Sequence, residues 1–264
     1  MWTLDSAATV PAWRSAPADP ACVLAFSTRR GGVSAAPRDS LNLGLSCGDR
    51  PESVLENRRR LLESLALDPG ALATAGQVHG TRICSVSRPG HEPGCDALLT
   101  LTPGLALAVA TADCMSLLYA APGAVATAHA GWRGAAAGMP TATLHALCAA
   151  AGVSADAVRV ALGPCIRACC YEVGPEVAGR FPASAVRTAE GRSYLDLPAV
   201  ARLQLLEAGL PPGAFEDTGA CTACEPYWYF SHRRDAGRTG RLWGLAALRP
   251  GDHPPPESTG GRRL

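Results

Sequence analysis

The 264-residue sequence has no lysine, no pair of histidines spaced as His-x-His, and no apolar run long enough to span a membrane. Its N-terminal stretch MWTLDSAATVPAW has an early aspartate, no basic start and no apolar segment of signal-peptide length. The net charge of +1 shows no bias toward nucleic acid or anionic membranes. We therefore expect a cytosolic protein with neither nucleic-acid nor membrane partners, whose ligands must be inferred from its sites.

Cysteine is abundant by contrast, with eleven residues, in a chain too large to need disulfide bonds for stability. We expect most of them to be reduced, small buried side chains. Two groups have spacings that resemble zinc ligands, namely Cys165, Cys169 and Cys170, and C-x-x-C at Cys221 and Cys224. Cys170 and Cys221 are 51 positions apart, so the sequence leaves open whether the two groups meet.

Segments of strand and helix character alternate along the chain, which predicts an α/β fold with a mixed β-sheet core, flanking helices and a single large domain. Residues 1–249 form the predicted catalytic domain, and 250–264, rich in proline and glycine, form a predicted disordered tail. Expected strands cover 21–30, 82–87, 105–119, 124–129, 158–162, 228–230 and 242–248, and expected helices cover 51–67, 141–151, a segment from about 176, and 198–208.

Two of these strands, 105–119 and 124–129, are joined by a short turn and form a predicted antiparallel hairpin. A turn centred between Ala121 and Pro122 would place Cys114 directly opposite His129, on the same face of the sheet. A thiolate and an imidazole so close together suit Zn²⁺ or copper, and a catalytic site would add a third protein ligand and keep the fourth position open.

The third ligand is expected to be another histidine. His145 falls in an expected helix, His91 in a loop rich in proline and glycine, and His253 in the tail, with His232 the other candidate. His79 is preferred because it stands in GQVHG, at a turn that enters a strand. The alternative is that Cys114 packs in the core and His129 makes an ordinary hydrogen bond, and spacing alone does not decide between the two.

A series of short motifs in a fixed order bears on whether these residues bind a metal or are structural. QVHG, DALLT, TADC, HAGWRG, LGPCI, CCYEVGPEV, CT with YFSHRRD, and TGR follow STRRGGVS, LNLG, GD and ENR, and span Ser27 to Leu248. In this order they resemble the polyphenol oxidase or laccase-domain family, whose members are also described as purine nucleoside phosphorylases with adenosine deaminase activity. The resemblance implies that His79, Cys114 and His129 form a metal-binding, catalytic trio. Ser116 stands where the family usually has proline.

Histidine content bears on which of these chemistries is possible. A multicopper oxidase needs many histidines, several in His-x-His pairs, whereas this chain has six and no such pair. A three-ligand Zn²⁺, or copper in its place, could activate water for adenosine deamination. Phosphorolysis requires in addition that arginines and backbone N–H groups hold phosphate. The sequence also leaves open that Cys114 acts as a thiolate nucleophile without metal.

Four residues are candidate substrate ligands, each with a structural alternative. Arg133 could bind phosphate beside a helix start or form a salt bridge. Arg29 at a strand end is a second candidate. The resemblance suggests that Asn42 and Gln77 form hydrogen bonds with the ribose or the base, although both could equally stabilise turns. Arg58, in a helix, is a weaker candidate. Trp132 is expected to pack rather than to stack on a base, and Asp113 to make a structural hydrogen bond.

The sequence thus predicts an enzyme, a purine nucleoside phosphorylase acting on adenosine, inosine and S-methyl-5′-thioadenosine, with metal-assisted adenosine deaminase activity. Its partners would be purine nucleosides and phosphate. Two alternatives remain: a hydrolase that edits peptidoglycan precursors, as some bacterial relatives are described, and a single-metal polyphenol oxidoreductase.

Overall fold

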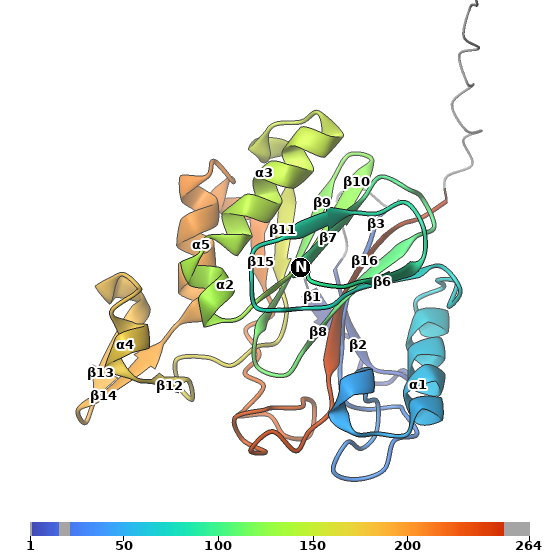
Figure 1. Ribbon diagram of the computed structural model, residues 1–264, viewed down its shortest axis with the longest axis horizontal. Helices are drawn as coiled ribbons and strands as arrows, with labels where there is room; N and C mark the ends of the chain where they lie inside the picture. The colour runs from blue at the N-terminus through green and yellow to red at the C-terminus, as the bar shows by residue number, and fades with distance from the viewer. Residues whose placement is uncertain (1, 16–21, 251–264) are drawn as a thin grey trace, which may run out of the picture.

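Two stacked β-sheets form the body of the protein in the computed structural model, which describes residues 2–15 and 22–250 (Figure 1). Each sheet mixes parallel and antiparallel strands. The seven-stranded sheet has the order β1 (Trp2–Leu4), β2 (Ala12–Ser15), β3 (Cys22–Ser27), β16 (Leu242–Leu248), β8 (Ala106–Thr111), β4 (Leu72–Ala75), β6 (Gly90–Glu92). The six-stranded sheet has the order β15 (Phe215–Asp217), β11 (Arg159–Leu162), β9 (Met115–Ala121), β10 (Ala124–Ala130), β7 (Ala97–Thr100), β5 (Ile83–Ser85).

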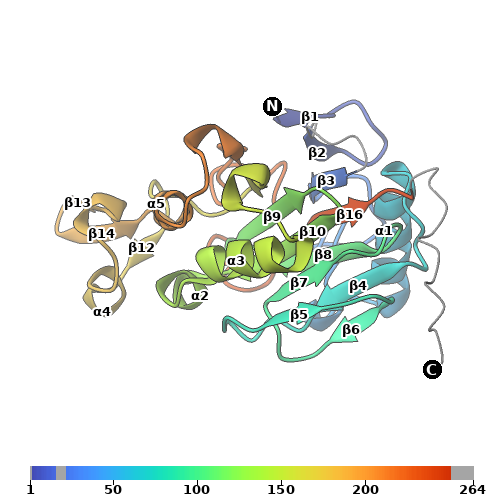
Figure 2. The same cartoon turned by 90° about the horizontal axis from the view of Figure 1, so that it is seen from above.

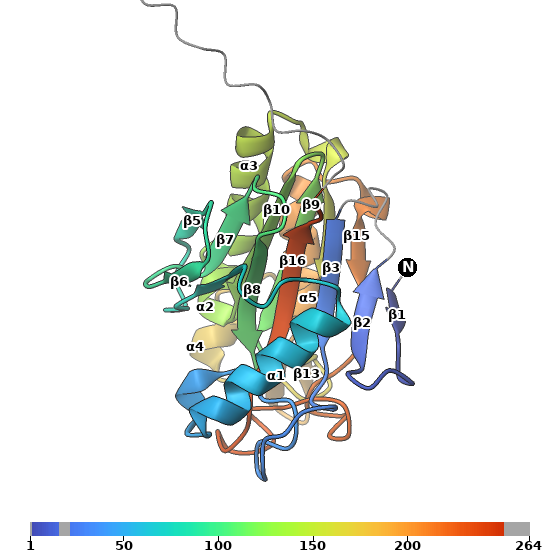
Figure 3. The same cartoon turned by 90° about the vertical axis from the view of Figure 1, so that its right-hand side faces the viewer.

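Helices cover the outer face of each sheet and complete four layers. Helix α1 (Pro51–Ser64) crosses the seven-stranded sheet, as Figure 3 shows from that side. On the opposite side lie α2 (Trp132–Ala136), α3 (Met139–Ala151) and α5 (Leu197–Glu207). The predicted α/β fold with a mixed-sheet core is confirmed. Short 3₁₀ turns occur at Leu45–Cys47, Ala155–Ala157, Ala183–Ala185 and Pro212–Ala214.

A small third sheet projects from the body beyond α5, together with α4 (Pro175–Ala178) (Figure 2). Its order is β12 (Glu172–Val173), β14 (Arg192–Leu195), β13 (Val186–Ala189). The helix expected from about residue 176 is therefore a single turn. The helices expected at 51–67, 141–151 and 198–208 are all present, although α1 stops at Ser64, where Ala66 adopts a left-handed φ of 55°.

The long apolar run of the sequence is explained by β8 and β9, inner strands of the two sheets, which are buried on both faces. Leu117 and Tyr119 of β9 pack against α3 through Leu144 and Leu147. Leu118, between them, faces the seven-stranded sheet and joins a second cluster that contains Phe26, Leu107 and Val125. Alternate residues thus enter different cores, so apolar residues are needed at every position.

The segment 105–119 was expected to be one strand, and this prediction is wrong. β8 ends at Thr111 and β9 begins at Met115, and the two strands belong to different sheets. The chain turns at Asp113, which has a left-handed φ of 94°. Because both strands are apolar, the pattern hides the junction, which lies at Cys114.

The expected hairpin register is also wrong, by two residues. Ala121 pairs with Ala124, so Pro122 and Gly123 form the turn and His129 lies opposite Ser116, not Cys114. Proline followed by glycine with φ of 71° fits a two-residue type II turn. Cys114 lies just before the start of β9, diagonal to His129, so the two residues remain neighbours despite the shift.

The strand expected at 228–230 does not form, because Tyr229 and Phe230 lie in a loop and are buried against Ala112 and Leu242. Aromatic residues favour strands in general, but here their burial is a tertiary contact. The expected strand at 82–87 is shortened to β5. The predicted tail lies, apart from Pro250, outside the described residues. No helix among the described residues is long and apolar enough to cross a membrane.

Candidate active site

Three side chains from separate parts of the chain converge where β8 gives way to β9. His79 comes from the loop after β4, Cys114 from the junction itself, and His129 from the C-terminal end of β10. One ligand atom from each, a ring nitrogen or the sulfur, lies within 4.8 Å of the other two. The two imidazole rings meet edge to face, with centroids 4.8 Å apart. The trio expected from the sequence is thus brought together.

Asp96, immediately before β7, holds two members of the trio in place. Its fully buried carboxylate accepts hydrogen bonds from the backbone N–H groups of Val78 (3.2 Å), His79 (2.9 Å) and Gly80 (2.8 Å). It also lies 2.9 Å from Nδ1 of His129. An ionised carboxylate can only accept, so Nδ1 of His129 donates, and Nε2 is the nitrogen left for the trio.

The sequence analysis missed Asp96, although it quoted the residue within DALLT. The available signal was an acidic residue directly before the three apolar residues that begin the strand ALLT, since a buried carboxylate needs several donors. Those donors come from a loop with unusual geometry, because Gln77 and His79 both have left-handed φ values, of 59° and 61°. Asp96 therefore compensates for a backbone conformation that the loop would not hold alone.

The two histidines differ in their protonation. Burial would lower the pKa of His129, but hydrogen bonds to Asp96 and Cys114 outweigh it and raise the pKa to about 9. Burial lowers the pKa of His79, and the neighbouring charges of His129 and Arg133 add to the effect. His79 is consequently a neutral imidazole near pH 7, whereas His129 is mainly protonated on both ring nitrogens at that pH, so a metal ion would have to replace the proton on its Nε2.

Gly131, in the segment AHAGWRG, lies directly against the trio. A Cβ atom added there would stand 3.1 Å from Sγ of Cys114 and 3.1 Å from Nδ1 of His79. Its φ of −77° is open to any residue, so the demand is for space rather than for backbone freedom. The glycine lets the chain leave β10 and enter α2 without displacing either side chain.

A cavity of about 760 Å³ opens beside the trio, whose three members all line it. Its wall continues over the outer face of the seven-stranded sheet, along β8 and the start of β16, to α1. Three arginines, Arg58, Arg233 and Arg241, also line it. A cavity of this size can hold a nucleoside-sized ligand, and its arginines can hold an anion.

Each of these arginines donates to a backbone oxygen, Arg233 from Nη1 to that of Glu172 at 2.8 Å. Arg58 donates to the backbone oxygen of Leu43 and lies over the Trp243 ring at 4.7 Å, and burial lowers its pKa to about 10, so it stays charged at neutral pH. Arg241 donates from Nη1 to the Gly240 oxygen at 3.0 Å. Arg233 and Arg241 stand in the motifs YFSHRRD and TGR, but the sequence analysis gave neither arginine a phosphate-binding role, because only the folded chain brings them to the same cavity as the trio.

Of the four expected substrate ligands, Gln77 lines the cavity. Both ends of its amide are engaged by Ala110 of β8: Oε1 accepts from the backbone N–H at 2.7 Å and Nε2 donates to the backbone oxygen at 2.6 Å. Gln77 therefore extends the contact with β8 beyond the end of β4, through its side chain. This contact fixes the start of the loop that carries His79.

Asn42 and Arg29 are not among the described residues that line the cavity. The fully buried Asn42 accepts from the backbone N–H of Arg241 at 2.8 Å and donates to Asp49 at 2.8 Å. Arg29 donates to the Asp39 backbone oxygen at 2.7 Å and lies 4.7 Å from the centre of the Phe230 ring. Asn42 holds the backbone of Arg241, which lines the cavity, whereas the residues that Arg29 contacts are not in the described lining.

Arg133 is exposed, stacks on the Trp132 ring at 4.3 Å, and is absent from the described cavity lining. Trp132 packs against the helix-side core, as expected. Helix α2, which opens here, has only five residues.

Two further expectations concern the junction itself. Asp113 makes structural hydrogen bonds, as expected: Oδ1 accepts from Thr222 Oγ1 at 2.7 Å and Oδ2 from the backbone N–H of Arg233 at 2.6 Å. Ser116 is buried, and its Cβ lies only 2.7 Å from the position that a Cβ on Gly244 would occupy. The small side chains at Ser116 and Gly244 allow the two sheets to approach closely beside His129.

We predict that Asp96→Asn lowers the free energy of unfolding by about 3 kcal/mol, because the amide turns an NH₂ group toward buried backbone donors. Chemical denaturation measures this change. Asp68→Asn is the matched control: Asp68 is exposed and caps only Gly70, so its effect should stay within about 0.5 kcal/mol. Equal effects at the two positions would refute the role given to Asp96.

Comparisons with known proteins identify the family to which the chain belongs. Residues 23–249 match the family model described as multi-copper polyphenol oxidoreductase laccase. A Deinococcus radiodurans protein named purine nucleoside phosphorylase is 40% identical over 230 residues, covering 85% of this chain and 88% of that protein. Purine nucleoside phosphorylase YfiH of Escherichia coli is 39% identical over 242 residues, covering 88% and 95%.

Solved structures show the same fold. The crystal structure of YlmD from Geobacillus stearothermophilus superposes with a TM-score of 0.86 at 37% identity, covering 90% of this chain and 96% of that one. The Bacillus licheniformis hypothetical protein YfiH gives a TM-score of 0.88 at 32% identity, covering 94% and 99%. The chain therefore belongs to the family described as multi-copper polyphenol oxidoreductase laccase, as its motifs predicted.

Proposed function

We propose that this protein is a purine nucleoside phosphorylase that acts on adenosine, inosine and S-methyl-5′-thioadenosine. The observation that carries the proposal is the position of His79, Cys114 and His129 on the wall of a cavity that three arginines also line. The names of the relatives support the same reaction class.

In phosphorolysis, a phosphate oxygen forms a bond to C1′ of the ribose while the bond from C1′ to the purine nitrogen breaks. The purine leaves with the electron pair and gains the proton that the phosphate loses, so the products are a free base and a sugar 1-phosphate, which is ribose 1-phosphate for adenosine and inosine and its 5-methylthio derivative for S-methyl-5′-thioadenosine. Arg58, Arg233 and Arg241 can hold the phosphate, since guanidinium groups bind its oxygens in pairs. Their backbone contacts fix them before the phosphate arrives, which favours the reacting geometry.

The trio also fits a metal ion. Two imidazole nitrogens and one sulfur form a donor set suited to Zn²⁺, or to copper in its place, with a fourth position open. Asp96 orients His129 in the way that carboxylates orient metal-binding histidines. A bound ion would supply Lewis-acid activation of water, the chemistry that adenosine deamination requires when water replaces the amino group at C6. We include this activity in the proposal.

A second candidate is oxidation of a polyphenol at a single copper ion, because the family description names that activity. Within the described part of the chain, the side chains that could hold metal form one group of three and one group of four cysteines. Neither group contains the many histidines of a four-copper centre. The nucleoside reaction is preferred because the cavity arginines suit phosphate and have no role in electron transfer.

The purified full-length protein with Zn²⁺ should release free base and ribose 1-phosphate from inosine only when phosphate is present, and should convert adenosine to inosine without it. Chromatography of the products measures both activities. His79→Ala, Cys114→Ala and His129→Ala should each lower kcat/KM by about 100-fold or more. His145→Ala, at an exposed position of α3, should leave it unchanged. Full activity in all three trio variants would exclude the proposed site.

Arg241→Ala should raise the KM for phosphate by about 10- to 100-fold with a smaller change in the KM for inosine, because a charged hydrogen-bond donor is lost. Arg133→Ala provides the comparison, since Arg133 lies over Trp132 rather than on the cavity wall. Steady-state kinetics at varied phosphate distinguish the two. If the KM for phosphate rises in Arg133→Ala and not in Arg241→Ala, phosphate binds beside α2 instead.

Gly131→Ala should weaken zinc binding by the trio about 10- to 100-fold, since the new Cβ would press on Cys114 and His79. Competition with a chromophoric chelator measures the affinity. Gly134→Ala is the matched control three residues later, where a Cβ would meet its nearest atom, the Gly80 oxygen, at an ordinary 3.4 Å. If both variants bind zinc like the original protein, the trio does not bind the ion at these three atoms.

A further inference from the structure

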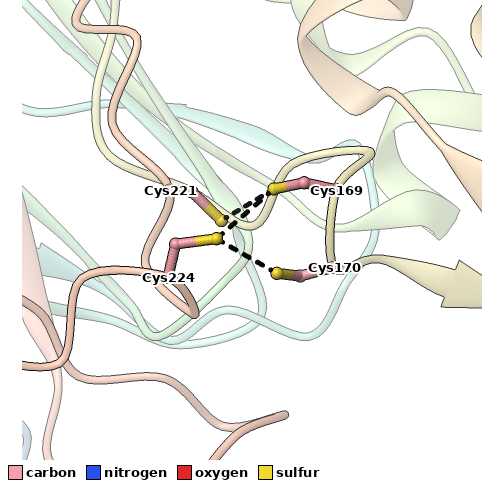
Figure 4. Close-up of side chains that lie close together, drawn as sticks. All are labelled: Cys169, Cys170, Cys221 and Cys224. Atoms are coloured by element: carbon pink, nitrogen blue, oxygen red, sulfur yellow. Dashed lines mark hydrogen bonds between the residues drawn. The ribbon is translucent and has the colours of Figure 1, made fainter.

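Four cysteines outside the cavity meet at a second place, which answers the question that their spacing left open (Figure 4). Cys169 and Cys170 come from the loop after β11, and Cys221 and Cys224 from the loop after β15. Cys165, the fifth cysteine of these motifs, is buried and forms a backbone bridge with Cys221 instead of joining the group.

The four sulfur atoms all lie within 4.8 Å of one another. Sγ of Cys169 is 3.6 Å from that of Cys221 and 3.5 Å from that of Cys224, and Cys170 lies 3.3 Å from Cys224. Four thiolates bound to Zn²⁺ at about 2.3 Å would be about 3.8 Å apart in a regular tetrahedron. The group is therefore already close to the size of a zinc tetrathiolate.

Ordinary packing does not explain this group. Cys169 and Cys224 are exposed and Cys170 is half-buried, so burial of apolar surface gives little reason for them to converge. A disulfide bond would bring two sulfurs to about 2.0 Å and leave the other two apart. All four are free thiols, and each has another sulfur of the group at 3.6 Å or less.

Backbone hydrogen bonds shape both loops around the sulfurs. The backbone N–H of Cys170 donates to the Arg167 oxygen at 2.8 Å, and the backbone N–H of Glu225 donates to the Cys221 oxygen at 3.2 Å. The C-x-x-C turn is closed further by Glu225, whose carboxylate accepts from the backbone N–H of Cys221 at 3.0 Å.

We propose that Cys169, Cys170, Cys221 and Cys224 bind one Zn²⁺ in a closed tetrathiolate site, separate from the trio. Four protein ligands leave no position for water or substrate, so the ion has a structural role. It cross-links two loops that lie 51 residues apart and joins them at a single point.

Both loops reach the active site, which gives the cross-link a purpose. Ile166, just before the first cysteine pair, and Tyr171, just after it, line the cavity. Thr222, between the second pair, holds the carboxylate of Asp113, and the backbone N–H of Ile166 donates to the Asp113 oxygen at 2.9 Å. Asp113 precedes Cys114, so the zinc-bound loops support the junction that presents this thiol.

Metal analysis of the full-length protein tests the proposal. Cys169→Ser/Cys224→Ser should reduce the zinc content by one ion per chain relative to the original protein. When Co²⁺ replaces zinc, the double variant should lose the strong thiolate-to-cobalt charge-transfer absorption, whereas the His79→Ala variant should retain it. Cys148→Ser, on α3 outside both groups, is the matched control and should change neither quantity. Equal zinc content and equal spectra in the double variant and the control would overturn the proposal.

A second measurement uses the unmodified chain, so it tests the proposal even if the double variant does not fold. With zinc bound, the four thiols should resist alkylation, and a chelator should expose them together while the labelling of Cys148 stays constant. Peptide mass spectrometry assigns the label to each cysteine. Labelling that is independent of the chelator, or disulfide-linked peptides in the freshly purified protein, would contradict a zinc site. His79→Ala removes a ligand of the trio but leaves the four cysteines unchanged. A failure of the proposed tetrathiolate site can therefore be distinguished from a failure of the proposed nucleoside chemistry.

Discussion

The buried carboxylate of Asp96 is the interaction on which the active site depends. Four N–H groups converge on it, three from the backbone of residues 78–80 and one from the His129 ring. Burying a charge is costly unless it is fully hydrogen-bonded, and here the compensation comes from the same groups that must be positioned. The donors hold the charge in place, and the charge in turn holds a loop with two left-handed residues against the end of β10.

A second constraint is the change of sheet between β8 and β9. One chain cannot pair in two stacked sheets without leaving the first, and Asp113 makes this turn with a left-handed φ while Thr222 and the Arg233 backbone bind its carboxylate. Cys114 follows Asp113 in the segment that connects the end of β8 to the start of β9. Asp113 and Asp96 therefore act alike, each fixing a strained backbone next to one of the metal-ligand candidates.

The sequence predicted the layered α/β fold and the three residues of the trio, because strand periodicity, helix termini and motifs are local signals. It failed on the break at Asp113 and on the register of β9 with β10, since a run that is apolar on both faces contains no mark of where a strand changes sheets. Asp96, Arg233 and Arg241 join the site through tertiary contacts only. The four thiols are also brought together by tertiary contacts. Their spacing in the sequence indicated metal ligands but did not show that the two pairs lie side by side.

The two candidate metal sites differ in what surrounds them, and this difference matches their number of ligands. The trio stands on the ends of buried strands, where sheet pairing and Asp96 already fix the side chains. An ion there is not needed for order, so its open position can serve chemistry. The four thiols stand on loops outside the named strands, and ligands that lack such support gain most from being joined. A closed site on the loops and an open site on the sheets is the arrangement that this difference in rigidity favours.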